Sequence, residues 1–128
     1  MSQSLSRIAL HIIFSTKERF PFLKDPEFRG QMHRYLAGAF NGLESPAIEV
    51  GGVQDHVHVL CLLSRTLSVS ETIQKAKASS SSWAKHHEGL LRKFSWQTGY
   101  GAFSVNPLQM DPVREYIRRQ EEHHRKRT

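Results

Sequence analysis

Cysteine is almost absent from this sequence, since Cys61 is the only one among 128 residues. A single thiol has no partner within the chain, so no intramolecular disulfide can form, and we expect a reducing compartment. Structural zinc sites are normally closed by four ligands, and the cysteines to complete one are missing. Cys61 lies in the apolar run 59–63, where we expect it to be a small buried hydrophobic residue.

Long hydrophobic runs are missing as well. Neither of the apolar stretches at residues 8–14 and 59–63 approaches the ~20 residues needed to span a bilayer. The residues from Met1 to Ser4 lack a secretory pattern. We therefore expect a soluble, cytoplasmic protein that does not associate with membranes.

Acidic residues are outnumbered, with twelve Asp and Glu against eighteen Lys and Arg, which gives a formal net charge of +6. Such a balance favours a polyanionic partner without specifying one. The eight histidines point to a metal, because neutral imidazole is a common metal ligand. The length fits one domain, since domains hold roughly 100–200 residues. We expect a single domain over residues 1–128.

Hydrophobic periodicity predicts strands and helices in the order βαββαβα. Alternating apolar residues indicate strands, whereas apolar residues three or four positions apart indicate amphipathic helices. The expected strands cover residues 8–15, 47–53, 56–63 and 100–105, and the expected helices follow caps at Asp25, Ser68 and Asp111. This order predicts an α+β fold, a ferredoxin-like or RRM-like βαββαβ antiparallel sheet with one added C-terminal helix.

The two later helices carry specific expectations. Ser68-Val69-Ser70-Glu71 is a capping box, but the serines at 79–82 should weaken the later turns of that helix because serine competes for backbone hydrogen bonds. The last helix should begin at Asp111-Pro112. Its inward face should carry Val113, Tyr116, Ile117, Gln120 and His124.

Two short patterns suggest chemistry. Side chains alternate along a strand, so His56 and His58 should share a face, while Tyr116 and Gln120 lie one helical turn apart. Taken alone, either histidine is more often structural than metal-binding, and an inward tyrosine is more often part of a core. Gln120 favours the functional interpretation, because an uncharged amide on the inward face of the helix needs buried polar partners or a role as a ligand.

Two imidazoles and one amide oxygen form an incomplete set of metal ligands, which leaves positions for phosphate oxygens and water. Mg²⁺ prefers oxygen ligands but would tolerate such a site, whereas Mn²⁺ suits the two nitrogens better. A divalent metal, Mg²⁺ or Mn²⁺, is therefore the expected cofactor.

Two stretches together resemble a known family. Residues 51–60 (GGVQDHVHVL) and 116–124 (YIRRQEEHH) closely resemble the single-tyrosine HUH transposases of the smallest bacterial and archaeal insertion sequences, the IS200-like type. Each stretch alone is moderately specific for the family. Their joint occurrence in this order, on a basic chain of this length, is a strong indication of the resemblance. The resemblance covers nearly the whole chain, including residues 11–17 (HIIFSTK).

The resemblance implies a role for each matching residue. His56, His58 and Gln120 would bind the metal, and Tyr116 would be the nucleophile that attacks a DNA phosphate. The enzyme would cleave and rejoin single-stranded DNA at hairpin-flanked element ends through a 5′-phosphotyrosine intermediate. A covalent intermediate conserves the bond energy, so no nucleotide cofactor is required. Asp55 would orient a ligating histidine or cap the turn.

The family acts on hairpins in single-stranded DNA and forms homodimers, commonly with the tyrosine helix of one subunit completing the site of the other. Basic side chains are candidates for phosphate contacts, although a solvated charged face is as good an interpretation for any one of them. These candidates are Lys17, Arg19, Lys75, Lys77, Lys85, Arg118 and Arg119.

Other readings of the sequence stay open. The nearest is a domesticated transposase-like protein associated with repetitive extragenic palindromes, which would share the site and be distinguished by its flanking DNA. A ferredoxin-like module that binds nucleic acid without cutting it would have no need for Tyr116 and Gln120 opposite a histidine pair. A metal-dependent nuclease that uses water would leave no protein–DNA adduct.

Overall fold

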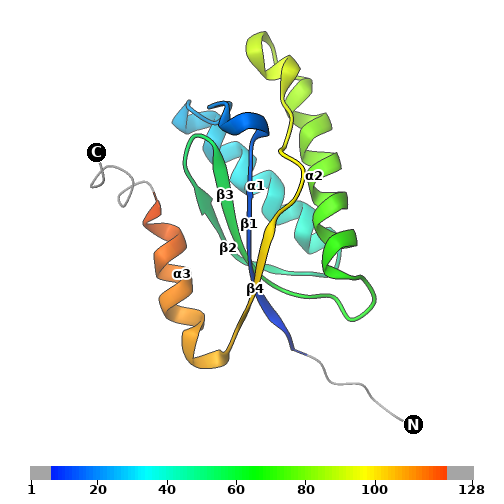
Figure 1. Cartoon of the computed structure of the whole chain (residues 1–128), viewed down its shortest axis with the longest axis vertical. Helices are drawn as coiled ribbons and strands as arrows, with labels where there is room; N and C mark the ends of the chain where they lie inside the picture. The colour runs from blue at the N-terminus through cyan, green and yellow to red at the C-terminus, as the bar shows by residue number, and fades with distance from the viewer. Residues whose placement is uncertain (1–6, 121–128) are drawn as a thin grey trace.

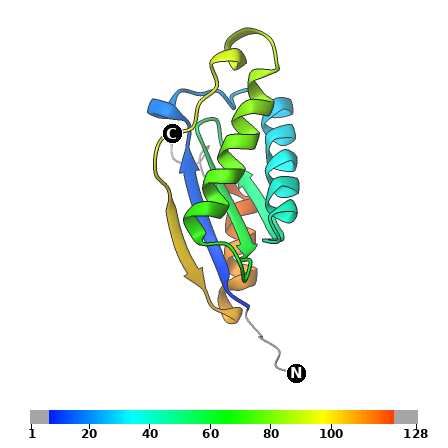
Figure 2. The ribbon, with the colours of Figure 1, turned by 90° about the vertical axis from the view of Figure 1, so that its right-hand side faces the viewer.

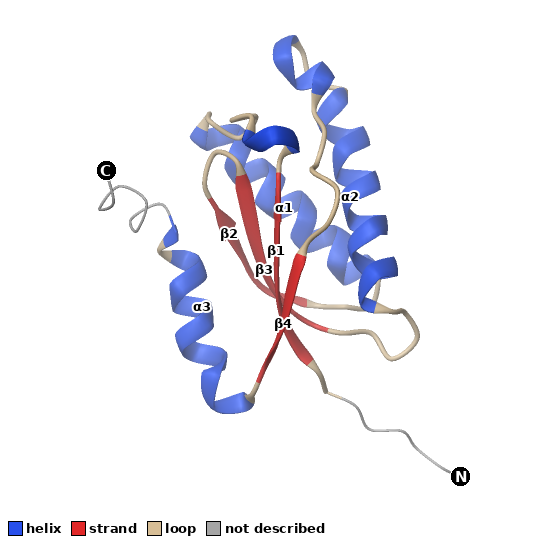
Figure 3. Ribbon diagram, viewed as in Figure 1, coloured by secondary structure: helices blue, strands red, loops and turns tan. Residues whose placement is uncertain are grey.

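Four antiparallel strands form one sheet in the order β2-β3-β1-β4 (Figures 1 and 3). The computed structural model describes residues 7–120 of the chain. The strands are β1 (Ala9–Ser15), β2 (Ala47–Gly52), β3 (His56–Leu62) and β4 (Gly101–Val105). Both the strand order and the βαββαβ succession confirm the predicted ferredoxin-like sheet.

Helices cover both faces of the sheet. Helices α1 (Pro26–Gly42) and α2 (Val69–Lys85) lie together on one face, and α3 (Met110–Arg118) lies on the other (Figures 1 and 2). Three short 3-10 helices, η1 (Lys17–Arg19), η2 (Gly89–Lys93) and η3 (Pro107–Gln109), complete the described elements. Within residues 7–120, none of the helices combines the length and apolar character needed to cross a membrane.

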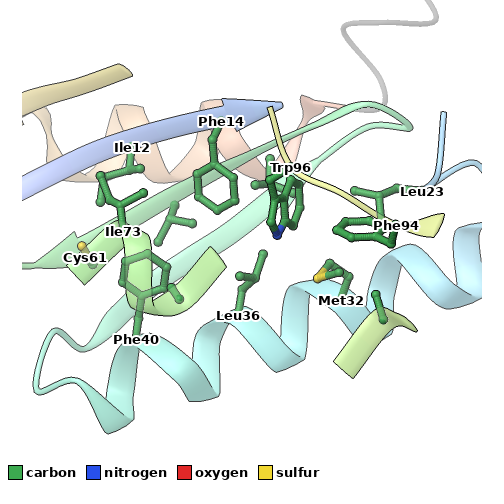
Figure 4. Packing of buried hydrophobic residues seen from close by; sticks show 14 of the residues in the cluster. Ile12, Phe14, Leu23, Met32, Leu36, Phe40, Cys61, Ile73, Phe94 and Trp96 are labelled. Atoms are coloured by element: carbon green, nitrogen blue, oxygen red, sulfur yellow. The ribbon is translucent and has the colours of Figure 1, made fainter. Parts of the chain in front are cut away.

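The main hydrophobic core lies between the sheet and the layer of α1 and α2 (Figure 4). Alternation along β1 directs Ile12 and Phe14 into this core, where they meet Leu36 of α1 and Ile73 of α2. Cys61 is fully buried there, as predicted, and burial raises the pKa of its thiol to about 12. The face of the sheet toward α3 is therefore left to side chains of the opposite parity.

The predicted caps of the first two helices are confirmed. The Asp25 carboxylate accepts a hydrogen bond from the Glu27 backbone at 3.2 Å, with Pro26 at the first helical position. Ser68 and Glu71 form both hydrogen bonds of the capping box. These contacts fix where α1 and α2 begin, and hence where the loops before them end.

Helix α2 does not end at its serines, because it continues without a break to Lys85. The Ser80 hydroxyl donates to the Ala76 carbonyl, one turn earlier in the helix, at 2.7 Å. The same oxygen accepts a hydrogen bond from the indole nitrogen of Trp96 at 2.9 Å. Ser80 therefore ties the segment before β4 to α2.

The last helix differs from its prediction at its start. Helix α3 begins at Met110, after η3, so Asp111 lies in its first turn and is not its cap. A carboxylate there still suits the positive end of the helix dipole, and Pro112 needs no backbone partner at such a position. The helix ends at Arg118, with Arg119 as its C-cap, and the predicted inward residue His124 lies outside the described residues.

Helix α3 approaches β2 closely enough to require a glycine. A Cβ atom at Gly51 would lie 2.5 Å from the backbone carbonyl oxygen of Ile117. The Ile117 residue is fully buried. Real Cβ atoms do not approach backbone that closely, so a larger residue would push the helix away from the sheet. Gly51 thus sets the height of α3 above the strands.

We expect Gly51→Ala to lower the free energy of unfolding by about 1–3 kcal/mol, the usual cost of overpacking a tight contact. The matched control is Gly38→Ala in α1, where a Cβ meets nothing within 4 Å and helix propensity should favour alanine by about 0.5–1 kcal/mol. Urea unfolding of both variants measures the two effects. Equal stability of Gly51→Ala and the unmodified protein would contradict the close approach.

Candidate functional site

The two strand histidines lie on the face of the sheet that α3 covers. Val57, between them, points into the main core, so His56 and His58 both point the other way. Their ring centroids are 5.2 Å apart at an interplanar angle of 65°. In the register of β3 with β1, His56 lies opposite Ser15 and His58 opposite Ile13.

Helix α3 brings the other two predicted side chains to this pair. The rings of Tyr116 and His58 are edge to face with centroids 5.8 Å apart. The Gln120 amide nitrogen donates to the Tyr116 carbonyl oxygen at 3.3 Å, and the Gln120 side chain also hydrogen-bonds His58. Gln120 is 4% exposed and Tyr116 is 45% exposed, so the amide is buried while the phenol reaches solvent.

These four side chains line one open groove of about 560 Å³. Its other walls come from the end of β1, from Arg19, and from the segment 98–103 that leads into and forms β4. The structure therefore brings together all four residues that the sequence singled out for chemistry.

His11 is a fifth polar side chain at the site, which the sequence reasoning did not assign a role. It lies on the same face of β1 as Ile13, and its Nε2 is 2.8 Å from Nδ1 of His58. The two rings stack with centroids 5.1 Å apart. A histidine at an alternating position of an apolar strand is the signal that could have identified it.

A carboxylate orients His56. Asp55 accepts from the Nδ1 of His56 at 2.9 Å, and its second oxygen accepts from Nε of Arg19 at 3.2 Å. Burial raises the pKa of the Asp55 carboxyl, but the hydrogen bonds and charges of His56 and Arg19 outweigh this, so the net shift is downward. The Asp55 contact supports the orienting role over the role of a simple turn cap.

Burial keeps the inner histidines neutral. It lowers the pKa of His58 to about 3, helped by the nearby charges of His11 and His56 and opposed by the hydrogen bond to Gln120. Burial also lowers the pKa of His11. A neutral imidazole has a lone pair on one ring nitrogen, which is the form that binds a cation.

The donor set fits an open divalent site better than a closed one. Among residues 7–120, no group of three His, Cys, Asp or Glu side chains is arranged to hold a metal ion. Two imidazoles and the Gln120 amide oxygen could hold one, because the amide nitrogen donates to the Tyr116 carbonyl and the oxygen, which accepts from His58 in the structure, would serve as the ligand atom. Such a set leaves coordination positions for a substrate.

The predicted DNA-contacting cations are dispersed over the molecule. Arg19 lines the groove, and Arg118 and Arg119 lie at the end of α3, where Glu49 and Glu115 pair with them. Lys75 and Lys85 are exposed on α2, in the layer across the sheet, and Lys17 is exposed in η1. Their contacts with DNA stay predictions.

Lys77 has a structural contact that the sequence did not indicate. Its ammonium donates to the backbone carbonyls of Gln97 at 2.8 Å and Gly99 at 2.6 Å. It also lies 5.4 Å from the centroid of the Phe14 ring, and burial lowers its pKa. Lys77 therefore links helix α2 to the segment before β4, which forms one wall of the groove.

The chain belongs to the family of IS200-like transposases, whose model matches residues 4–120. It is thus a member of a family of DNA-cleaving enzymes. No protein with a curated description matches the chain.

Two solved structures share the fold. One is a candidate transposase from Deinococcus radiodurans R1, with a TM-score of 0.69 and 19% identity over 94% of this chain and 98% of that chain. The other is described as a REP-associated tyrosine transposase bound to a REP hairpin, with a TM-score of 0.68 and 14% identity over 97% of this chain and 74% of that chain. At these identities the two structures support the architecture and no individual side-chain role.

The attachment of α3 depends on Glu49 as well as on Gly51. Glu49 lies two residues before Gly51, on the same face of β2. Its carboxylate accepts hydrogen bonds from Nε of Arg114 at 3.0 Å and from Nε of Arg118 at 3.1 Å. Both arginines belong to α3, whereas Glu115 pairs with Arg118 and Arg119 within that helix and its cap. Glu49 is therefore the carboxylate that links α3 to the sheet.

We expect Glu49→Gln to speed hydrogen exchange of the α3 amides about twofold to fivefold, which corresponds to about 0.5–1 kcal/mol of local stability for a partly exposed pair. Glu115→Gln is the matched control, because it removes the same charge without touching β2. If hydrogen exchange of the α3 amides were accelerated equally in both variants, the effect would come from the charge of the helix and not from its attachment to β2.

Proposed function

We propose that this transposase cleaves and rejoins single-stranded DNA at hairpin-flanked element ends, with Tyr116 as the nucleophile. The observation that carries the proposal is the convergence of Tyr116, His56, His58 and Gln120 in one open groove. The exposed phenol is accessible to a phosphate, while the imidazoles and the amide are held in place by burial and hydrogen bonds.

The proposed reaction is a transfer of the phosphodiester bond to tyrosine. The Tyr116 oxygen forms a bond to phosphorus, and the bond between phosphorus and the 3′ oxygen breaks. The proton lost by the phenol is balanced by the proton gained by the 3′ oxygen, which leaves a 3′-OH and a 5′-phosphotyrosine. A 3′-OH then attacks the phosphotyrosine and releases Tyr116, so rejoining needs no nucleotide cofactor.

Mg²⁺ or Mn²⁺ is the proposed cofactor, held by His56, His58 and Gln120. When bound, such an ion polarises the phosphate and stabilises negative charge on the leaving 3′ oxygen. The protein's contribution is to present neutral imidazoles and an amide at a fixed spacing. Asp55 supports this by accepting from Nδ1 of His56, which directs the opposite nitrogen of that ring to the ion.

Hairpin DNA is the proposed substrate because the family resemblance, the positive net charge and the solved relative bound to a REP hairpin all favour it. The same relative keeps the domesticated form, a protein associated with repetitive extragenic palindromes, as a second candidate. Paired element ends flanking the gene would identify the mobile form.

Three further expectations stay predictions: a homodimer, a cytoplasmic location, and a single domain over residues 1–128. The homodimer rests on the family resemblance. In the structure, α3 packs on β2 and β3 of its own chain.

Tyr116→Phe should abolish strand cleavage and the covalent adduct, because only the nucleophilic oxygen is removed and the packing of the ring is kept. Tyr100 also lines the groove, so Tyr100→Phe tests the other accessible phenol and should still form adduct. The substrate is a hairpin oligonucleotide with Mg²⁺ or Mn²⁺, and the products are resolved under denaturing conditions. Normal adduct from Tyr116→Phe would remove Tyr116 as the nucleophile.

End labels in the same experiment report the polarity. Protease-sensitive, slowly migrating label should appear only when the 3′ end is marked, because that fragment begins with the captured 5′ phosphate. Adduct carrying the 5′ label would instead mean a 3′-phosphotyrosine. Equal cutting of a blunt duplex would reject the single-strand assignment, and cutting without any adduct would favour a water-dependent nuclease.

Cleavage should require a divalent metal, and His56→Ala, His58→Ala and Gln120→Ala should each weaken Mn²⁺ binding in calorimetric titrations. The physical reason is the loss of one donor from an already incomplete set. His86→Ala is the control, since His86 is an exposed histidine at the end of α2 whose ring contacts the Ser82 carbonyl. Wild-type affinity in all three site variants would reject the metal site.

A further inference from the structure

His11 is a half-buried polar side chain in contact with His58, and the proposed chemistry does not use it. It projects from β1, whose other residues are largely apolar on both faces of the sheet. Its side chain is half-buried beneath α3. Its shortest polar contact is the 2.8 Å approach of its Nε2 to Nδ1 of His58. Placing an imidazole under a helix carries a desolvation cost unless that contact is used.

The contact between two neutral imidazoles admits two arrangements of protons. In the first, His58 carries its hydrogen on Nδ1 and donates to His11, so the Nε2 of His58 has a lone pair. In the second, His11 donates to Nδ1 of His58, so the hydrogen of His58 sits on Nε2 and meets the Gln120 amide oxygen. Only the first arrangement can bind a cation through Nε2 of His58.

We propose that His11 is a positioning residue that sets the tautomer of His58, by accepting a hydrogen bond from Nδ1 of His58 and so directing the Nε2 lone pair to the metal. The proposal rests on the proposed function, in which His58 is a metal ligand. Passage from the second arrangement to the first conserves protons: the hydrogen of His58 moves from Nε2 to Nδ1, and that of His11 moves from Nε2 to Nδ1.

The two strand histidines would then be oriented by different groups. Asp55, a carboxylate, receives the Nδ1 hydrogen of His56, and His11, a neutral imidazole, receives that of His58. Metal-binding histidines usually donate their second nitrogen to an acceptor that fixes the ring, and loss of such a partner commonly weakens metal binding. A neutral acceptor suits the more buried ring, because a second carboxylate there would itself need a charged partner.

The alternative role for His11 is to accept the Tyr116 proton directly. The His11 and Tyr116 rings are edge to face with centroids 6.4 Å apart, whereas His11 and His58 are in hydrogen-bond contact. The two roles also differ in what they predict. A proton acceptor would affect cleavage and leave metal affinity unchanged, whereas a positioning residue would affect metal affinity first.

The test uses two substitutions in the full chain, with Mn²⁺ as the probe. His11→Phe keeps an aromatic ring and removes the acceptor, and it should weaken Mn²⁺ binding about 10- to 100-fold. His11→Gln supplies an amide oxygen near the position of Nε2 and should restore affinity close to that of the unmodified protein. Metal-free hairpin binding should be the same in all three proteins.

A double-mutant cycle separates this inference from the proposed function. His11 acts only through His58, so His11→Phe should have no further effect on Mn²⁺ affinity in a His58→Ala background. An equal loss with and without His58 would overturn the proposal and make His11 a ligand or a general packing residue. If His58→Ala itself leaves affinity unchanged, the proposed metal site fails, whatever His11 does.

Nitrogen NMR on the unmodified protein keeps the proposal testable if His11→Phe does not fold. With Mg²⁺ bound, the long-range correlations of His58 should show hydrogen on Nδ1 and none on Nε2, and those of His11 should also show hydrogen on Nδ1. Hydrogen on Nε2 of His11 in the loaded protein would overturn the proposal. Unchanged metal affinity with reduced cleavage in His11→Phe would likewise overturn it, and would assign proton transfer instead.

Discussion

The seating of α3 on the sheet is the contact on which the groove depends. Tyr116 comes from this helix and Gln120 directly follows its C-cap, while the histidines come from the strands beneath, so the four side chains meet only while α3 is seated on the sheet. Ile117 packs against the bare backbone of Gly51, and Glu49 reaches up to two arginines of the helix. A nine-residue helix with one fully buried side chain is thus held by a close approach and a carboxylate.

The sheet divides its side chains between two tasks. One parity of β1 and β3 fills a dry core with α1 and α2, and the other parity carries His11, His56 and His58 toward α3. Because the two sets alternate along the same strands, the rigidity of the core is transmitted directly to the imidazoles. The hydrogen bonds to Asp55 and His11 then restrict the rotation that the backbone leaves free.

Local patterns were enough to predict the elements. Alternation located the strands, and capping residues located the starts of α1 and α2, because both signals arise from contacts within a few residues. The sequence did not indicate the structural role of Ser80, because its partner Trp96 is sixteen residues away. The start of α3 was misplaced by two residues, because η3 leads directly into the helix at Met110 and Asp111 is not its cap.

The site was predictable where spacing alone brings residues together. His56 with His58, and Tyr116 with Gln120, are neighbours by strand and helix geometry. His11, Glu49 and Lys77 act through contacts across the sheet or between a helix and a loop, which depend on the register of β1 with β3 and on the height of α3. No local pattern contains that information, so those contacts emerged only with the tertiary structure.

The alternation of core and groove residues along β1 and β3 has an evolutionary consequence. Under the proposed function, replacing an imidazole on the groove face would remove cleavage without replacing any side chain of the core, so a descendant would lose cleavage while keeping its fold. Mutations that silence the chemistry are then nearly invisible to selection for stability. A lineage in which selection retains only DNA binding would then evolve through variants that are all stably folded.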